Sequence, residues 1–198
     1  MLKLIEVSNS LPVSVQAFMA HARIVDADEN TVIEDKLRAA TEFVGDRCSL
    51  QIVPATFRIE RNCFPTRKFH ILIAPVREIV SVKYRDASGQ LQTVDEEHYG
   101  WRRTPEGAEL EFLPSFSVPA VQPDKSDAVQ IELRAGFDYD GATGASDKPE
   151  LKVPMRLRQV IMLIAAHWYE HREAVDPAAM HQVPLAAESI MSQLRIWR

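Results

Sequence analysis

The chain has 198 residues, of which 46% are hydrophobic and 26% are charged, and its formal net charge is −5. This length and composition suit a globular domain with a buried core and exclude a chain that is disordered throughout. The acidic balance argues against a protein whose main task is tight nucleic-acid binding, because such proteins normally carry a basic surface.

The cysteines and the apolar runs indicate the compartment. Cys48 and Cys63 lie in no C-x-x-C or C-x-x-H pattern, so we expect two free thiols and no zinc site. The first residues contain no long apolar run with a cleavage site, so we expect no secretory signal. The longest apolar run, Val160–Ala166, is far shorter than a membrane span. A reducing cytoplasm and no membrane partner are therefore expected.

Residues 10–53 show helical periodicity. Ser10–Pro12 predicts the start of a first helix that runs to about Ala22, because proline is tolerated in the first turn of a helix. Residues Thr31–Glu34 fit a capping box at the start of a second helix. The apolar stripe expected on the first helix is Val15, Phe18 and Ala22. On the second helix, apolar residues at the spacing of one helix face are Ile33, Leu37, Ala40 and Val44.

Residues 54–135 change to the period of strands and predict an antiparallel β module. Asp86–Gly89 has the composition of a hairpin turn, and the proline-rich Pro114–Asp127 is typical of an extended loop. The expected strands are Thr56–Arg61, Phe69–Ile73, Ile79–Tyr84, Leu91–Val94, Ala108–Leu113 and Ala128–Leu133.

Residues 136–153 have no apolar period and are expected to form a mobile loop. Pro154 then starts a strongly apolar helix, and a last helix is expected from Pro184 to about Leu194. The prediction is an α+β fold in a single domain, residues 1–198. About four helices form a core from residues 10–53 and 154–198, the β module of residues 54–135 is inserted between them, and long loops connect these parts.

Three patterns could carry chemistry. His167, Glu170 and His171 form H-x-x-E-H, the spacing of an inverted zinc-peptidase motif, which makes a zinc-dependent hydrolase the alternative interpretation of the chain. Such a site needs a third ligand, commonly an acid well downstream, but only 27 residues follow His171 and Glu188 is the sole acid in the last helix, so we assign no metal site. The acidic run Asp95–Glu97 is expected to be solvated charge in a turn.

A basic tract with interleaved aromatic residues includes Arg58, Arg61, Arg67 and Lys68 and could contact a phosphate backbone, although a solvated strand face is the preferred interpretation. There is no nucleophile elbow and no glycine-rich phosphate loop, so we assign no catalytic residue, no cofactor and no enzymatic activity.

The helix that follows Val153 resembles the signature of the head–tail connector (adaptor) family of tailed bacteriophages, which also includes proteins of phage-like gene transfer agents. The matching segment is V-P-M-R-L-R-Q-V-I-M-L-I-A-A-H-W-Y-E-H-R-E-A, Val153–Ala174. It departs from the family pattern at Val160, where alanine is common, and at His171, where asparagine is frequent. Further ordered matches lie at Ala20–Ile24, Ala39–Arg47, Leu72–Gly89, Ile131–Phe137 and Val183–Pro184.

The resemblance implies a structural protein of the virion, made in the host bacterial cytoplasm and located at the head–tail interface. It implies a homo-oligomeric ring, expected to be dodecameric, that docks beneath the portal protein and extends the DNA channel. The ring would receive the tail or a head-completion protein (a stopper or tail terminator), and DNA would pass through without sequence-specific binding.

Within this resemblance two groups of residues receive roles. The central helix and oligomer interface would use Leu157, Ile161, Ile164, Trp168, Tyr169, Glu170 and Arg172, with Glu170 and Arg172 as charged partners. Docking to the portal would use the C-terminal Ile196, Trp197 and Arg198, because an aromatic residue beside an arginine is a favoured interface element. The alternative is that these residues form a frayed tail.

Overall fold

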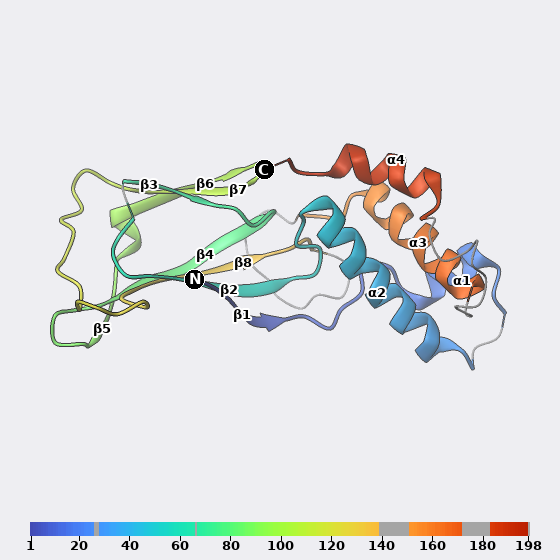
Figure 1. Cartoon of the computed structure of the whole chain (residues 1–198), viewed down its shortest axis with the longest axis horizontal. Helices are drawn as coiled ribbons and strands as arrows, with labels where there is room; N and C mark the ends of the chain where they lie inside the picture. The colour runs from blue at the N-terminus through green and yellow to red at the C-terminus, as the bar shows by residue number, and fades with distance from the viewer. Residues whose placement is uncertain (26–27, 66, 139–150, 172–182, 198) are drawn as a thin grey trace. The chain divides into compact units, whose positions relative to one another are not determined.

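The computed structural model describes residues 1–25, 28–65, 67–138, 151–171 and 183–197 (Figure 1). These residues form two compact units. The β unit comprises Met1–Ser8 and Pro54–Phe137, and the helical unit comprises Asn9–Val53 and Asp138–Trp197. Four α-helices and two antiparallel sheets confirm the predicted α+β class. None of the helices in the described part of the chain has the length and apolar character needed to cross a bilayer.

The β unit contains a five-stranded sheet, sheet A, in the order β1-β2-β8-β4-β5, and a three-stranded sheet, sheet B, in the order β3-β7-β6. The strands of sheet A are β1 (Leu2–Val7), β2 (Ala55–Arg61), β8 (Val129–Ala135), β4 (Val76–Arg85) and β5 (Leu91–Thr93). Those of sheet B are β3 (Lys68–Ile71), β7 (Gly107–Phe112) and β6 (Tyr99–Thr104), and a short 3₁₀ helix, η1 (Glu96–His98), precedes β6.

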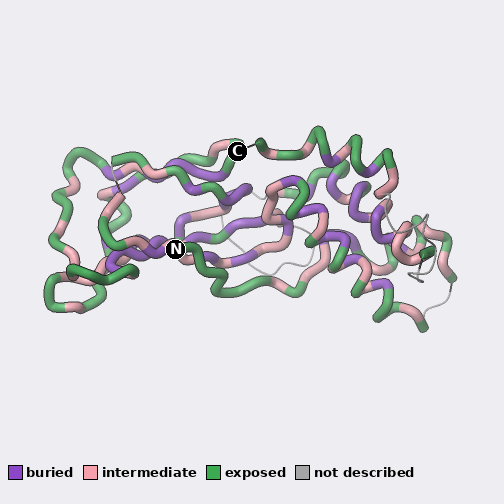
Figure 2. Tube along the Cα trace, viewed as in Figure 1, coloured by how far each residue is buried: buried purple, intermediate pink, exposed green. Residues whose placement is uncertain are grey.

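The two sheets face one another and share one apolar core (Figures 1 and 2). Alternate residues of β2 and β8 point into this core, which is why the period of two in the sequence located both strands. Sheet B contributes the buried side chains of β7 on its inner face. The fully buried members with the largest side chains are Ile71, Leu110, Ile131, Leu133 and Val76.

Two strands were not predicted from the sequence. Strand β1 pairs with β2 along Leu2–Val7, so the first residues of the chain belong to the β unit together with residues 54–137. All six residues of β1 are exposed, and without a buried face the strand shows no clear alternation. Strand β6, Tyr99–Thr104, contains Gly100 and two consecutive arginines, which also obscures the period of two.

The helical unit consists of α1 (Val15–Ala22), α2 (Asn30–Cys48), α3 (Met155–Glu170) and α4 (Leu185–Leu194). The stripe predicted on α2 is confirmed, because Ile33, Leu37, Ala40 and Val44 are all fully buried. Pro154 and Pro184 immediately precede α3 and α4, as predicted from the preference of proline for helix starts.

Two predicted helix starts were wrong. The first helix begins at Val15 rather than near Pro12, because the Ser14 hydroxyl caps it by accepting a hydrogen bond from the Ala17 amide at 3.2 Å. The capping box at Thr31–Glu34 does not form, since α2 already begins at Asn30 and no side chain caps it. The Glu34 carboxylate instead pairs with Arg38, one turn later, at 2.5 Å.

Of the two long loops expected from the sequence, the structure describes the first. In the loop predicted at Pro114–Asp127, Phe116 stacks on Phe112 with ring centroids 5.0 Å apart, and Val121 forms an isolated bridge with Asp86. Most of the loop predicted at residues 136–153 lies outside the described residues, so its predicted mobility stays a prediction. The predicted turn Asp86–Gly89 is present, and it joins β4 to β5.

Candidate functional site: the central helix and the C-terminal segment

Helix α3 occupies the middle of the helical unit, where it packs against α1, α2 and α4. The side chains of Leu157, Ile161 and Ile164 are at most 1% exposed. Val160 and Ala165 are buried as well, so the apolar surface of α3 is used on more than one side. Leu157, Ile161 and Ile164 are therefore packed inside the helical unit, and their predicted part in the oligomer interface stays a prediction.

The C-terminal turn of α3 is fixed by aromatic contacts. Trp168 meets the Phe43 ring of α2 edge-on, with centroids 5.5 Å apart, and Tyr169 meets Phe18 of α1 in the same manner at 6.3 Å. The Tyr169 hydroxyl also donates a hydrogen bond to the carboxylate of Glu29. Edge-to-face pairs contribute about 0.5–1.5 kcal/mol each beyond the area that they bury. Trp168 and Tyr169 thus hold α3 to the first two helices.

The predicted charged partners lie where α3 ends. Glu170 is the last residue of the helix and is exposed. Arg172 lies outside the described residues, so its pairing with Glu170 stays a prediction.

The two histidines of the H-x-x-E-H motif lie side by side with their rings tilted against one another. The rings of His167 and His171 lie 4.5 Å apart, and the His171 Nδ1 is 2.9 Å from the His167 carbonyl oxygen. Among the described residues, the one group of three side chains whose ligand atoms come close enough to hold a metal is Asp95, Glu97 and His98, at and before η1. No third ligand therefore joins the two histidines within the described part of the chain.

The C-terminal segment leaves α4 and is tethered just before its aromatic residue. The Ile196 amide donates a hydrogen bond of 3.0 Å to the carbonyl of Cys48, at the end of α2. The guanidinium of Arg195 lies 4.5 Å from the centroid of the Trp197 ring, whose residue is 71% exposed. Burial raises the pKa of the Cys48 thiol, although the charge of Arg195 opposes this effect. The tether holds Trp197 in an exposed position, and Arg198 lies outside the described residues.

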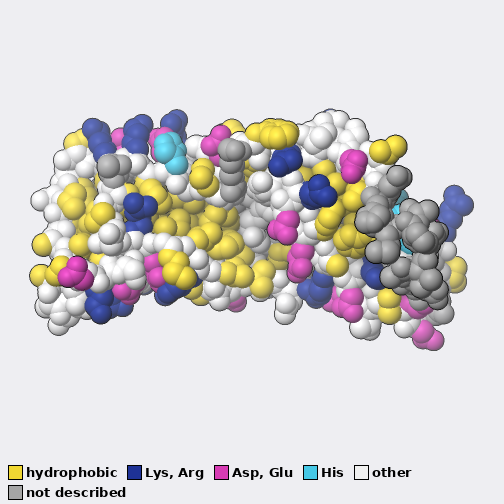
Figure 3. All heavy atoms as spheres, in the orientation of Figure 1, with side chains coloured by type: hydrophobic (Ala, Val, Ile, Leu, Met, Phe, Trp, Pro, Cys, Tyr) yellow, Lys and Arg dark blue, Asp and Glu magenta, His cyan; other side chains and the backbone are white. Residues whose placement is uncertain are grey.

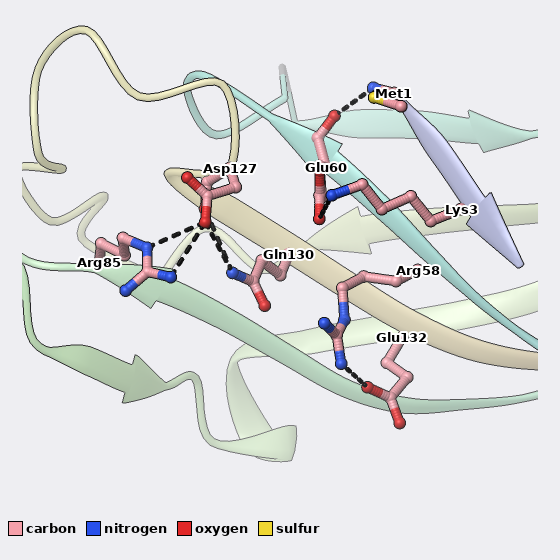
Figure 4. Close-up of polar contacts among 8 residues, drawn as sticks. All are labelled: Met1, Lys3, Arg58, Glu60, Arg85, Asp127, Gln130 and Glu132. Carbon is pink, nitrogen blue, oxygen red and sulfur yellow. Dashed lines mark hydrogen bonds and ion pairs between the residues drawn. The ribbon is translucent and has the colours of Figure 1, made fainter. Parts of the chain in front are cut away.

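Charged side chains gather along the two outward faces of the β unit, with hydrophobic side chains between them (Figure 3). Sheet A carries ion pairs between neighbouring strands, Lys3–Glu60 at 2.8 Å and Arg58–Glu132 at 3.2 Å, and Arg85 of β4 pairs at 3.0 Å with Asp127, just before β8 (Figure 4). Arg85 holds the pKa of Asp127 below its usual value. Among the described carboxyl groups, every clear pKa change is a decrease, whereas a general acid requires an increase.

The basic tract predicted from the sequence does not form one surface. Arg58 lies on sheet A, where it pairs with Glu132, and the Arg61 guanidinium lies 5.1 Å from the centroid of the Phe69 ring. Arg67 and Lys68 belong instead to sheet B. The pairing of the strands places these basic residues on different surfaces, and their order in the sequence does not reveal this.

The fold and these surfaces define an α+β protein with a closed helical unit, a β sandwich and exposed segments suited to contacts with other chains. No protein-family model matches the chain, and no curated protein matches it by sequence. Solved structures of gene transfer agent (GTA) particles contain chains with this fold along their full length.

One of these matches is to a chain of the neck of an empty GTA particle computed with C6 symmetry, with a TM-score of 0.74 and 22% identity. Another is to a chain of the virion of a native GTA particle, with a TM-score of 0.75 and 22% identity. A third is to a chain of the neck of a native GTA particle computed with C12 symmetry, with a TM-score of 0.71 and 21% identity. Each match covers 100% of this chain and 96% of the other. The resemblance inferred from the sequence is thus confirmed at the level of the fold.

Proposed function

We propose that the protein is a non-enzymatic connector in the neck of a tailed phage or gene transfer agent particle. In this proposal copies form a ring, expected to be dodecameric, that docks beneath the portal protein, extends the DNA channel and receives the tail or a head-completion protein. The observation that carries the proposal is the full-length likeness to chains of particle necks with C6 and C12 symmetry. A ring requires a heterologous interface, in which two different patches of the chain meet.

Strand β1 is the surface that we assign to the neighbouring copy. It is an edge strand of sheet A, and its Leu2, Leu4, Ile5 and Val7 are all exposed. A long apolar edge strand that stays uncovered invites association with other chains. We place the ring contact on β1 because its apolar side chains are exposed, whereas Leu157, Ile161 and Ile164 of α3 are buried in the protomer.

Lysine substitution of both Leu2 and Leu4 is expected to prevent ring formation and leave the protomer folded. The two residues are 52% and 56% exposed, so the new side chains can reach water in the free protomer but would be buried in the contact. Val25→Lys, at a position that is 95% exposed in the helical unit, is the control for added charge. Unchanged rings with the double variant would remove β1 from the interface.

Trp197 is the residue that we assign to the portal. Large aromatic residues beside arginine dominate many interfaces, and the tether at Ile196 limits the entropy lost when Trp197 is buried. Deletion of Ile196, Trp197 and Arg198 is expected to abolish portal docking while the protomer stays folded. Leu185→Ala, which truncates an 81% exposed apolar side chain on α4, should leave docking unchanged. Docking by the truncated chain would refute the assignment.

Electron microscopy of the purified protein mixed with the portal of its own particle tests the proposal as a whole. A ring stacked coaxially on the portal is the expected result. If the two proteins do not associate at any ratio, the connector function is wrong. Metal analysis of the same preparation separates the hydrolase alternative, which requires stoichiometric zinc that is lost in His167→Ala.

A further inference from the structure

The outward face of sheet B is built from two rows of side chains across its three strands. In one row, His70 of β3, Glu109 of β7 and Arg102 of β6 are direct neighbours. In the other row, Lys68 of β3 and Glu111 of β7 lie beside Gly100 of β6. Arg67, just before β3, reaches the same face, since its Nε lies 3.3 Å from Glu111.

Glu109 is recessed in this face, Glu111 is 34% exposed, and the cations project further. The side chain of Glu109 is 9% exposed, whereas those of Lys68 and Arg102 are 53% and 71% exposed. Glu109 accepts hydrogen bonds from the Lys68 ammonium at 3.3 Å and from Arg102 Nε at 3.2 Å. Burial alone would raise the pKa of Glu109, but these two cations outweigh it and hold that pKa below its ordinary value. The ionised carboxylate beneath them therefore orders the cations without covering them.

The charges of the face do not cancel. Two carboxylates, Glu109 and Glu111, face the three permanent cations Arg67, Lys68 and Arg102. The face is therefore locally basic although the whole chain has a net charge of −5. Lys and Arg side chains, with a histidine among them, gather along this margin of the β unit in Figure 3.

The same face lacks what a protein partner would need. None of the strand positions on it carries an apolar side chain, whereas protein interfaces have an apolar centre. At Gly100 a Cβ atom would have no neighbour within 4 Å, so the surface is open between the cations. A basic face whose strand positions carry no apolar side chain fits a polyanion that is recognised by charge alone.

We propose that the outward face of sheet B binds the phosphate backbone of double-stranded DNA, through Arg67, Lys68 and Arg102 and without reading the base sequence. This contact goes beyond the proposed function and does not depend on ring formation, so the isolated protein is sufficient to test it. Three phosphate contacts predict that log K falls with log salt at a slope of about −3.

The test is fluorescence anisotropy of a short labelled DNA duplex with the full chain, between about 50 and 200 mM salt. The double variant Arg67→Gln/Arg102→Gln is expected to reduce the slope to about −1, since each lost phosphate contact removes about one unit. The matched control is Arg58→Gln/Arg134→Gln, which removes the same formal charge from the outward face of sheet A, where both arginines are paired with glutamates. It should keep the slope of the unaltered protein.

Gly100→Asp is the second variant, and it removes none of the residues that form the ion pairs of the face. The new carboxylate has free space and adds a negative charge beside Glu111, on the face that carries Arg67, Lys68 and Arg102, so it should weaken DNA binding at least as much as the loss of one arginine. Circular dichroism verifies that each variant is folded. The proposal is overturned if the unaltered protein does not bind the duplex at about 50 mM salt, or if the sheet A control loses as much affinity as the sheet B variant. Binding to polyglutamate as tight as to the duplex would likewise overturn it, since an acidic protein would then be the partner.

Discussion

Truncation of Ile161 to alanine separates the two roles that the sequence assigned to α3, packing of the protomer and contact between copies. Ile161 is 0% exposed in the middle of the helix, so the change leaves a cavity that α1, α2 and α4 can fill only in part. Such truncations cost about 2–5 kcal/mol, and Ile161→Val should cost about 0.5–1.5 kcal/mol. Met155→Ala, at a 73% exposed position of the same helix, should change stability by less than about 0.5 kcal/mol.

The assay is urea unfolding followed by far-UV circular dichroism, at protein concentrations below and above those at which rings form. Because the cavity lies inside one protomer, Ile161→Ala should lower the unfolding free energy by the same amount at both concentrations. A loss that appears only in the assembled state would refute the reasoning and return the stripe of α3 to the oligomer interface. A loss as small as that of Met155→Ala would show that the site is not close-packed.

Three further results are expected. Gly107→Ala should destabilise the β unit by more than about 1 kcal/mol, measured by thermal unfolding, because Gly107 has φ +150° and a Cβ there would lie 2.0 Å from a backbone oxygen. Hydrogen bonds from Ser88 and Gln92 lower the pKa of Asp86 to about 2. The ionised carboxylate therefore stabilises its turn fully above the unfolded pKa of about 3.9, and this contribution is lost as pH falls through about 2. Asp86→Asn should remove that pH dependence of stability, and an NMR titration that gives Asp86 a pKa near 4 would contradict the prediction. Exposed Cys63 should react with iodoacetamide in the native protein while buried Cys48 reacts only in urea, and mass spectrometry showing both labelled at equal rates would disprove the burial.

Local patterns were sufficient where a single element sets its own environment. The apolar stripe from Ile33 to Val44 needs only one buried helix face, and the turn at Asp86–Gly89 needs only its own hydrogen bonds. The predicted start of the first helix was wrong because Pro12 and Ser14 are both suitable residues for a helix start and lie only two positions apart. The sequence pattern does not decide which of the two begins the helix.

The sequence by itself determined the α+β class, the strongly apolar α3 and the resemblance to connectors, because periodicity and composition are properties of the linear chain. The tertiary structure decided which surfaces remain for partners. Leu157 and Ile161 are equally apolar whether they face a neighbouring helix or another copy, and only packing shows that they are enclosed. The basic face likewise depends on register, which brings Lys68 and Arg102 from separate strands onto Glu109 of the strand between them.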